Sequence, residues 1–112
     1  MIETVSQGTV HDPLSESVRR LRASLSAERI YLFGSRARDE ADEDSDFDFL
    51  VVVRDSSLPR YKREQQAFRS LCGMGIAKDV LVFTRAEFDK GLAVVSSLPS
   101  TVAREGRLLY GG

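Results

Sequence analysis

Apolar residues change between helical and strand spacing along the chain, so the sequence predicts alternating helices and strands. A helix is expected from Ser15 to Leu25, where apolar residues recur on one helical face, with Ser15 or Ser17 as its cap. The mostly polar residues 1–14 are expected to form a loose lead-in, which leaves 15–112 as the folded domain.

Three segments have the composition of strands. Arg29–Phe33 is rich in aromatic and branched residues and stops at Gly34. Phe47–Val53 is the strongest strand signal, and its second half is apolar on both faces, which is typical of a central strand. A third strand is expected within residues 76–84, centred on Val80 to Phe83.

Helices are expected between and after these strands. They cover Tyr61 to Cys72, a short segment from Thr84 or Arg85 to Gly91, and residues 98–106. Residues 108–110 fit either a short final strand or a docking tail. This order indicates an α/β (α+β) fold, with a small mixed β-sheet of about three to four strands flanked by helices.

Composition narrows the class of protein. A chain of 112 residues fits one domain, and its net charge of −1 gives no general attraction to nucleic acid or to anionic lipid. Cys72 is the only cysteine, so an intrachain disulfide is excluded. No signal peptide is visible, and the longest apolar run, Phe49 to Val53, is too short to span a bilayer. The cytoplasm is the expected location.

Asp46 and Asp48 are the first candidate site residues. They are two apart at the start of a strand, so both carboxylates are expected on one face, while Phe47 and Phe49 point into the core. Carboxylates placed this way suit a divalent cation such as Mg²⁺. A solvated acidic loop is the competing interpretation, because seven of the ten residues from Asp39 to Asp48 are acidic.

Two further elements favour a metal–nucleotide site. Gly34 follows a strand and lets the backbone approach a ligand, and Ser35, Arg36 and Arg38 supply a hydroxyl and cations for phosphate. Asp79 opens the third strand as the other aspartates open theirs, and it joins them if the two strands are neighbours. Taken singly, Gly-Ser is a very weak signal that an ordinary turn explains, and a surface aspartate paired with Lys78 or a nearby arginine is the favoured interpretation of Asp79.

The combination resembles the DNA polymerase β-like nucleotidyltransferase superfamily, whose pattern is Gly-Ser, a spacer, Asp-x-Asp and a later third carboxylate. Residues 32–38 (LFGSRAR), 45–51 (SDFDFLV) and 105–110 (EGRLLY) are similar to its minimal nucleotidyltransferase branch. The resemblance covers about residues 15–110, with one departure: Asp39 stands where that branch often has glycine.

The resemblance implies a polymerase β-like nucleotidyltransferase fold and a role for each motif residue. Two Mg²⁺ ions would be held, and catalysis carried, by Asp46, Asp48 and Asp79. ATP phosphates would be bound by Gly34, Ser35 and Arg36. A hydroxyl acceptor would attack the α-phosphorus of ATP and release pyrophosphate.

The resemblance also implies a partner, because 112 residues leave none for a separate acceptor-binding domain. Minimal members resemble the antitoxin of a HEPN/MNT toxin–antitoxin pair, which transfers AMP from ATP to a tyrosine of a HEPN-family toxin. Two alternatives remain open. The chain could neutralise a toxin by contact alone, or it could modify a small hydroxylated molecule without a protein partner. Neither a membrane nor a nucleic acid is expected as a partner.

The remaining notable residues have ordinary structural interpretations. His11 is expected at the surface, and Cys72 as a small buried filler. A solvated basic cluster is expected from Arg60, Lys62 and Arg63, and core positions are expected for Tyr61, Phe68, Phe83 and Phe88. Tyr110 either packs on the core or contacts a partner.

Overall fold

The computed structural model describes residues 12–37 and 45–111, which form four helices and four strands. In chain order these are α2 (Pro13–Leu25), β1 (Arg29–Phe33), β2 (Phe47–Val53), α3 (Arg60–Ser70), β3 (Lys78–Thr84), α4 (Arg85–Leu92), α5 (Leu98–Glu105) and β4 (Arg107–Tyr110). His11, Arg38 and Asp39 lie outside the described residues.

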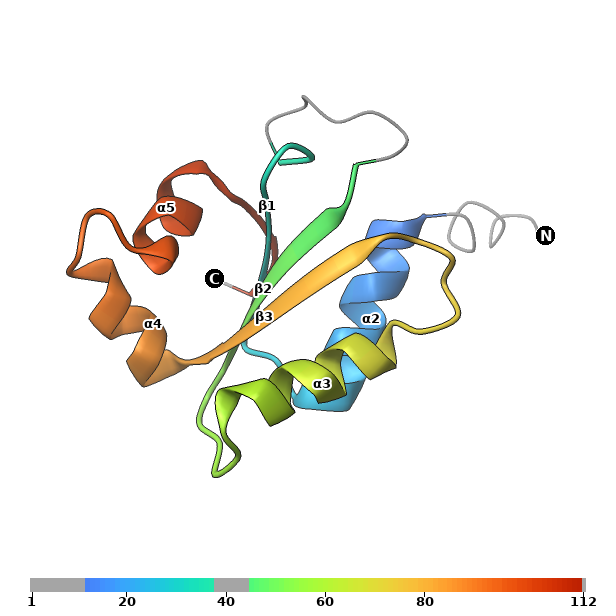
Figure 1. The fold of residues 1–112 in the computed structure, drawn as a ribbon, viewed down its shortest axis with the longest axis horizontal. Coiled ribbons are helices and arrows are strands. Elements are labelled where there is room, and N and C mark those ends of the chain that lie inside the picture. Colours follow the sequence, from blue (N-terminus) through green and yellow to red (C-terminus); the bar gives the residue numbers. More distant parts are fainter. Residues whose placement is uncertain (1–11, 38–44, 112) are drawn as a thin grey trace.

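The strands form one mixed sheet in the order β3-β2-β1-β4 (Figure 1). β1 pairs antiparallel with β2 and with β4, and β2 pairs parallel with β3 through the crossover helix α3. The predicted mixed sheet is therefore confirmed, and the final segment is a strand. Tyr110 of β4 packs on the core beside α2, with the Arg22 guanidinium 4.1 Å from its ring.

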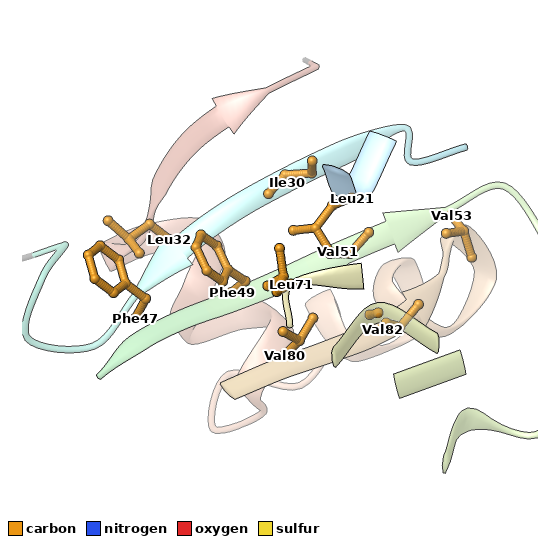
Figure 2. Close-up of a cluster of buried hydrophobic side chains, with 11 residues drawn as sticks. Leu21, Ile30, Leu32, Phe47, Phe49, Val51, Val53, Leu71, Val80 and Val82 are labelled. Carbon is orange, nitrogen blue, oxygen red and sulfur yellow. The ribbon is translucent and has the colours of Figure 1, made fainter. Parts of the chain in front are cut away.

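Helices cover both faces of the sheet (Figure 1). α2 and α3 pack on one face around the buried residues shown in Figure 2, among them Leu21, Phe49 and Leu71. α4 and α5 pack on the other face through Phe88 and Val102. β2 contributes buried side chains to both clusters, which confirms it as the central strand expected from its apolar second half.

Helix α2 begins earlier than its spacing predicted, and its expected caps are wrong. Asp12 is the cap, since its carboxylate accepts the Leu14 N–H at 3.1 Å, and Pro13 fits the first turn because it has no N–H to satisfy. Ser17 is instead buried, with its hydroxyl 3.7 Å from the sulfur of Met74. No helix among the described residues is long and apolar enough to cross a bilayer.

Helix α3 presents a different side to the sheet from the one predicted. Arg63 and Ala67, followed by Leu71, face the sheet and are buried. Tyr61 and Phe68 are 62% and 46% exposed, so their prediction as core residues is wrong. Spacing alone misplaced this side, because a buried arginine occupies a position where an apolar residue was expected.

The other two aromatic core predictions hold, and the prediction for Cys72 does not. Phe83 and Phe88 are buried, between the sheet and α4. Cys72 is exposed, just past the end of α3, so its expected role as a buried filler is wrong.

Arg63 is buried because it satisfies polar groups at the outer edge of β3. Its guanidinium donates to the carbonyls of Leu58 and Val82, each at 3.2 Å, and to both carboxylate oxygens of Glu87 at 2.9 and 3.0 Å. Its prediction as part of a solvated basic cluster is therefore wrong. Glu64 accepts the Val82 N–H at 3.1 Å, so α3 side chains cover both backbone groups of that residue.

Candidate functional site

The strand register brings the predicted site residues to one edge of the sheet. Phe33 pairs with Asp48, and Asp48 pairs with Asp79, so three adjacent strands contribute at the same level. Because β2 and β3 both begin at this edge and β1 ends there, Gly34 lies beside the aspartates. The strands that carry Asp48 and Asp79 are therefore neighbours, which the sequence prediction required for Asp79 to join the other aspartates.

Asp48 and the aromatic residues of β2 point to opposite faces, as the alternation predicted for that aspartate. Phe47 and Phe49 stack with ring centroids 6.2 Å apart on the α2–α3 side. Asp48 alternates with them and therefore points to the α4–α5 side, where the next residue of that row, Leu50, is buried. Asp46 lies immediately before β2 rather than within it, and it is exposed.

Gly34 is in close contact with the Asp48 side chain. Its φ is +78°, in the left-handed region that favours glycine. A Cβ at this position would overlap Oδ2 of Asp48, so no other residue allows the loop to lie this near the carboxylate. The loop after β1 and the acidic start of β2 therefore form one structural unit.

The residues after Gly34 form a turn, in which the Ala37 N–H donates to the Gly34 carbonyl at 3.1 Å. Ser35 lies in this turn, directly after the glycine that contacts the Asp48 side chain. Arg36 is held against the start of β2: its Nε donates to the Ser45 carbonyl at 3.0 Å, and its guanidinium lies 3.8 Å from the Phe47 ring centroid. Arg36 therefore connects the turn after β1 to the start of β2. Its binding of phosphate stays a prediction.

The three carboxylates influence one another electrostatically. Partial burial raises the pKa of Asp48 above its usual value, and the negative charges of Asp79 and Asp46 raise it further. Within residues 12–37 and 45–111, no three His, Cys, Asp or Glu side chains form a ready-made group that could hold a metal ion. The carboxylates of Asp46 and Asp79 are thus near enough to raise the pKa of Asp48, but the three groups do not form a complete set of metal ligands.

A groove that the sequence did not reveal lies next to Asp79. It runs between α3 and β3, has a volume of about 460 Å³, and is lined by Tyr61, Phe68, Cys72, Asp79 and Val80, among others. The expectation that Tyr61, Phe68 and Cys72 are buried hid this groove. The one sequence feature that could indicate it is a pair of aromatic residues, Tyr61 and Phe68, seven positions apart on the helix before the strand of Asp79.

Comparison with solved structures agrees with this fold. The structure of a candidate nucleotidyltransferase from Sulfolobus solfataricus has a TM-score of 0.63 and 21% identity, over 99% of this chain and 90% of that one. A mutant of the MntA–HpeT toxin–antitoxin gives 0.61 and 19%, and a toxin–antitoxin with AMP-PNP gives 0.54 and 22%; each covers 88% of this chain and 73% of that one. At these identities the likeness concerns the fold.

Comparison of sequences gives the family. A candidate protein adenylyltransferase of Methanocaldococcus jannaschii is 34% identical over 55 residues, which are 49% of this chain and 54% of the relative. The match thus spans about half the length of this curated relative. The model of the nucleotidyltransferase domain matches residues 14–108, which include every candidate site residue described above. The chain therefore belongs to the nucleotidyltransferase domain family.

Proposed function

We propose that this chain transfers AMP from ATP to a hydroxyl of a partner protein, and that it acts in the cytoplasm as the antitoxin of a toxin–antitoxin pair. The observation that carries the proposal is the register of Asp48 and Asp79 on adjacent strands, with Gly34 against the Asp48 carboxylate. Membership of the nucleotidyltransferase family supports the reaction class. The relative named as a protein adenylyltransferase supports a protein acceptor.

Asp46, Asp48 and Asp79 are the proposed ligands of two Mg²⁺ ions. Mg²⁺ favours one or two carboxylates together with substrate phosphate oxygens, so a closed cage of protein ligands is not required. The negative charges of Asp79 and Asp46 raise the pKa of Asp48, and a bound divalent cation would offset this repulsion. When bound, the ions would neutralise phosphate charge and align the reacting groups.

Two toxin–antitoxin structures of similar fold are consistent with the proposed nucleotide and with the spacing of the two aspartates. One was determined with AMP-PNP, an ATP analogue. In the other, two aspartates separated by one residue are replaced by glutamates, which is the spacing of Asp46 and Asp48 in this chain. We assign the nucleotide phosphates to the N–H groups and hydroxyl of the Gly34–Ser35 turn, because a glycine at positive φ leaves its backbone open to a ligand.

The reaction then needs an acceptor oxygen on the side of Asp79. A bond forms between this oxygen and the α-phosphorus, while the bond from the α-phosphorus to the bridging oxygen of the β-phosphate breaks and pyrophosphate leaves. Asp79 is exposed and can accept the proton of the hydroxyl. By family resemblance, the proposed acceptor is a tyrosine of a HEPN-family toxin.

The test is transfer of label from α-³²P-ATP to the product of a neighbouring gene, which this proposal expects to be a HEPN-family toxin. We expect Mg²⁺-dependent labelling that chelator abolishes and that Asp48→Asn reduces by at least about a hundredfold. Asp89→Asn is the matched control, because Asp89 is an exposed aspartate on α4, beyond the opposite end of β3.

Two outcomes would replace the proposal. If wild-type protein labels nothing, while Asp46→Asn and Asp48→Asn proteins still neutralise the toxin, the chain acts by contact alone. If labelled product forms with a small hydroxylated molecule and no protein is needed, it is a stand-alone transferase.

A further inference from the structure

The outer edge of β3 is only partly covered. β3 is an edge strand, so one set of its backbone groups faces away from β2. Arg63 and Glu64 cover these groups at Val82, and Glu87 accepts the N–H of Thr84 at 2.9 Å. Since backbone groups alternate in direction along a strand, the N–H and C=O of Val80 face the same way as those of Val82.

The described side chains that hydrogen-bond to the outer backbone groups of β3 do not reach Val80. Among the described residues, no side chain hydrogen-bonds to its outward backbone groups, and they lie in the groove beside α3. Tyr61 and Phe68 line the groove with exposed rings, and Leu81 also lines it. An open backbone edge beside two aromatic side chains is the arrangement that binds an extended peptide by strand addition.

The groove is also continuous with the candidate site on the side where the acceptor must enter. Gly34, Asp48 and Asp79 follow one another across β1, β2 and β3, so the groove beyond Asp79 is the side farthest from Gly34. In-line displacement puts the attacking oxygen opposite the leaving pyrophosphate. With the phosphates at Gly34–Ser35, the acceptor approaches over Asp79.

We propose that the groove between α3 and β3 binds the acceptor protein as an extended segment that pairs with β3 at Val80 and presents its hydroxyl residue beside Asp79. On a paired strand, the residue directly opposite Asp79 shares its face, with Cβ atoms roughly 5 Å apart. Its side chain therefore points to the same side of the sheet as Asp48. This inference rests on the proposed function and identifies where the partner docks.

Substitution of the exposed rings tests the docking surface. In the toxin-labelling assay, Tyr61→Ala and Phe68→Ala should each raise the KM for the toxin by at least about tenfold, with the Kd for ATP–Mg²⁺ within about twofold of wild type. Leu108→Ala is the matched control for Phe68→Ala, because Leu108 is 44% exposed on β4 at the opposite edge of the sheet. Its KM should stay at the wild-type value.

The single cysteine gives an independent test in the wild-type chain. Cys72 is exposed and lines the groove, so alkylation with a bulky maleimide should reduce toxin labelling at least about tenfold. Cys72→Ser protein, treated in the same way, should keep its full rate. Unchanged labelling after complete alkylation, or a raised Kd for ATP in place of a raised KM for the toxin, would overturn the proposal; the second result would assign the groove to the nucleotide base.

Amide hydrogen exchange separates this proposal from the proposed function. Toxin binding should slow exchange of the Val80 N–H at least about tenfold and leave that of Val82 unchanged, because Glu64 already accepts the Val82 N–H. Protection of Val80 without label transfer would reject the reaction but retain the docking site. Label transfer without protection of Val80 would reject the docking site alone.

Discussion

Replacing Gly34 with alanine is expected to remove transfer activity while leaving the fold nearly intact. An L residue at its φ of +78° is strained by roughly 1–2 kcal/mol. The new Cβ would overlap Oδ2 of Asp48, which is the far end of a short side chain and can turn away at little cost in stability. A carboxylate displaced by about 1 Å at a reacting centre costs on the order of a hundredfold in rate.

Gly73→Ala separates backbone strain from this contact. Gly73 has φ of +87°, and a Cβ there meets nothing within 4 Å. Both variants should therefore lose a similar ~1–2 kcal/mol of unfolding free energy in urea. In the toxin-labelling assay only Gly34→Ala should lose its rate, by about a hundredfold.

Two results would refute this reasoning. Equal transfer rates in Gly34→Ala and Gly73→Ala would mean that the contact with Asp48 has no functional role. A destabilisation of Gly34→Ala above about 4 kcal/mol, with Gly73→Ala near wild type, would mean that the contact supports the fold rather than the site.

Three further outcomes concern charged residues that are buried or partly buried. Arg63→Met should lower the free energy of unfolding in urea by about 2–3 kcal/mol, because the Val82 carbonyl and Glu87 lose their donor, whereas the exposed control Lys62→Met should change it by less than about 0.5 kcal/mol. The Arg63 hydrogen bond lowers the pKa of Glu87 to about 2 from 4.5, so its stabilisation is complete above pH 4.5 and is lost as the pH falls towards 2. After discounting for solvent screening of this 44%-exposed side chain, the loss should be about 1 kcal/mol in urea titrations across that range, and Glu87→Gln should flatten it. Asp48→Asn should raise the Tm without divalent ions, since it removes a partly buried charge among like charges, and it should abolish any rise in Tm that Mg²⁺ gives the wild type.

The strands could be predicted from the sequence because their signals are local. Phe47–Val53 alternates and then becomes apolar on both faces, and the observed β2 has these same bounds. Arg29–Phe33, closed by Gly34, is likewise found as β1. The positions of the candidate residues Asp48 and Gly34 could be predicted together with these strands, because both residues lie at strand ends.

The side that α3 turns to the sheet could not be predicted, because it depends on distant partners. Arg63 reaches the Val82 carbonyl, 19 residues later, and Glu87, 24 residues later. Without those contacts a buried arginine is unfavourable, so the apolar spacing of the sequence favours Tyr61 and Phe68 for the core. The groove beside Asp79 was hidden for the same reason.

The position of β4 has a consequence for the making of this protein. β1, which ends directly before Gly34, lies between β2 and β4, and β4 is built from Arg107–Tyr110. During translation one edge of β1 therefore stays unpaired until Arg107–Tyr110 have left the ribosome. Pairing between segments this far apart in sequence is slow compared with local contacts. A nascent chain should thus complete the sheet beside Gly34 only after Tyr110 has been made and β4 has paired with β1.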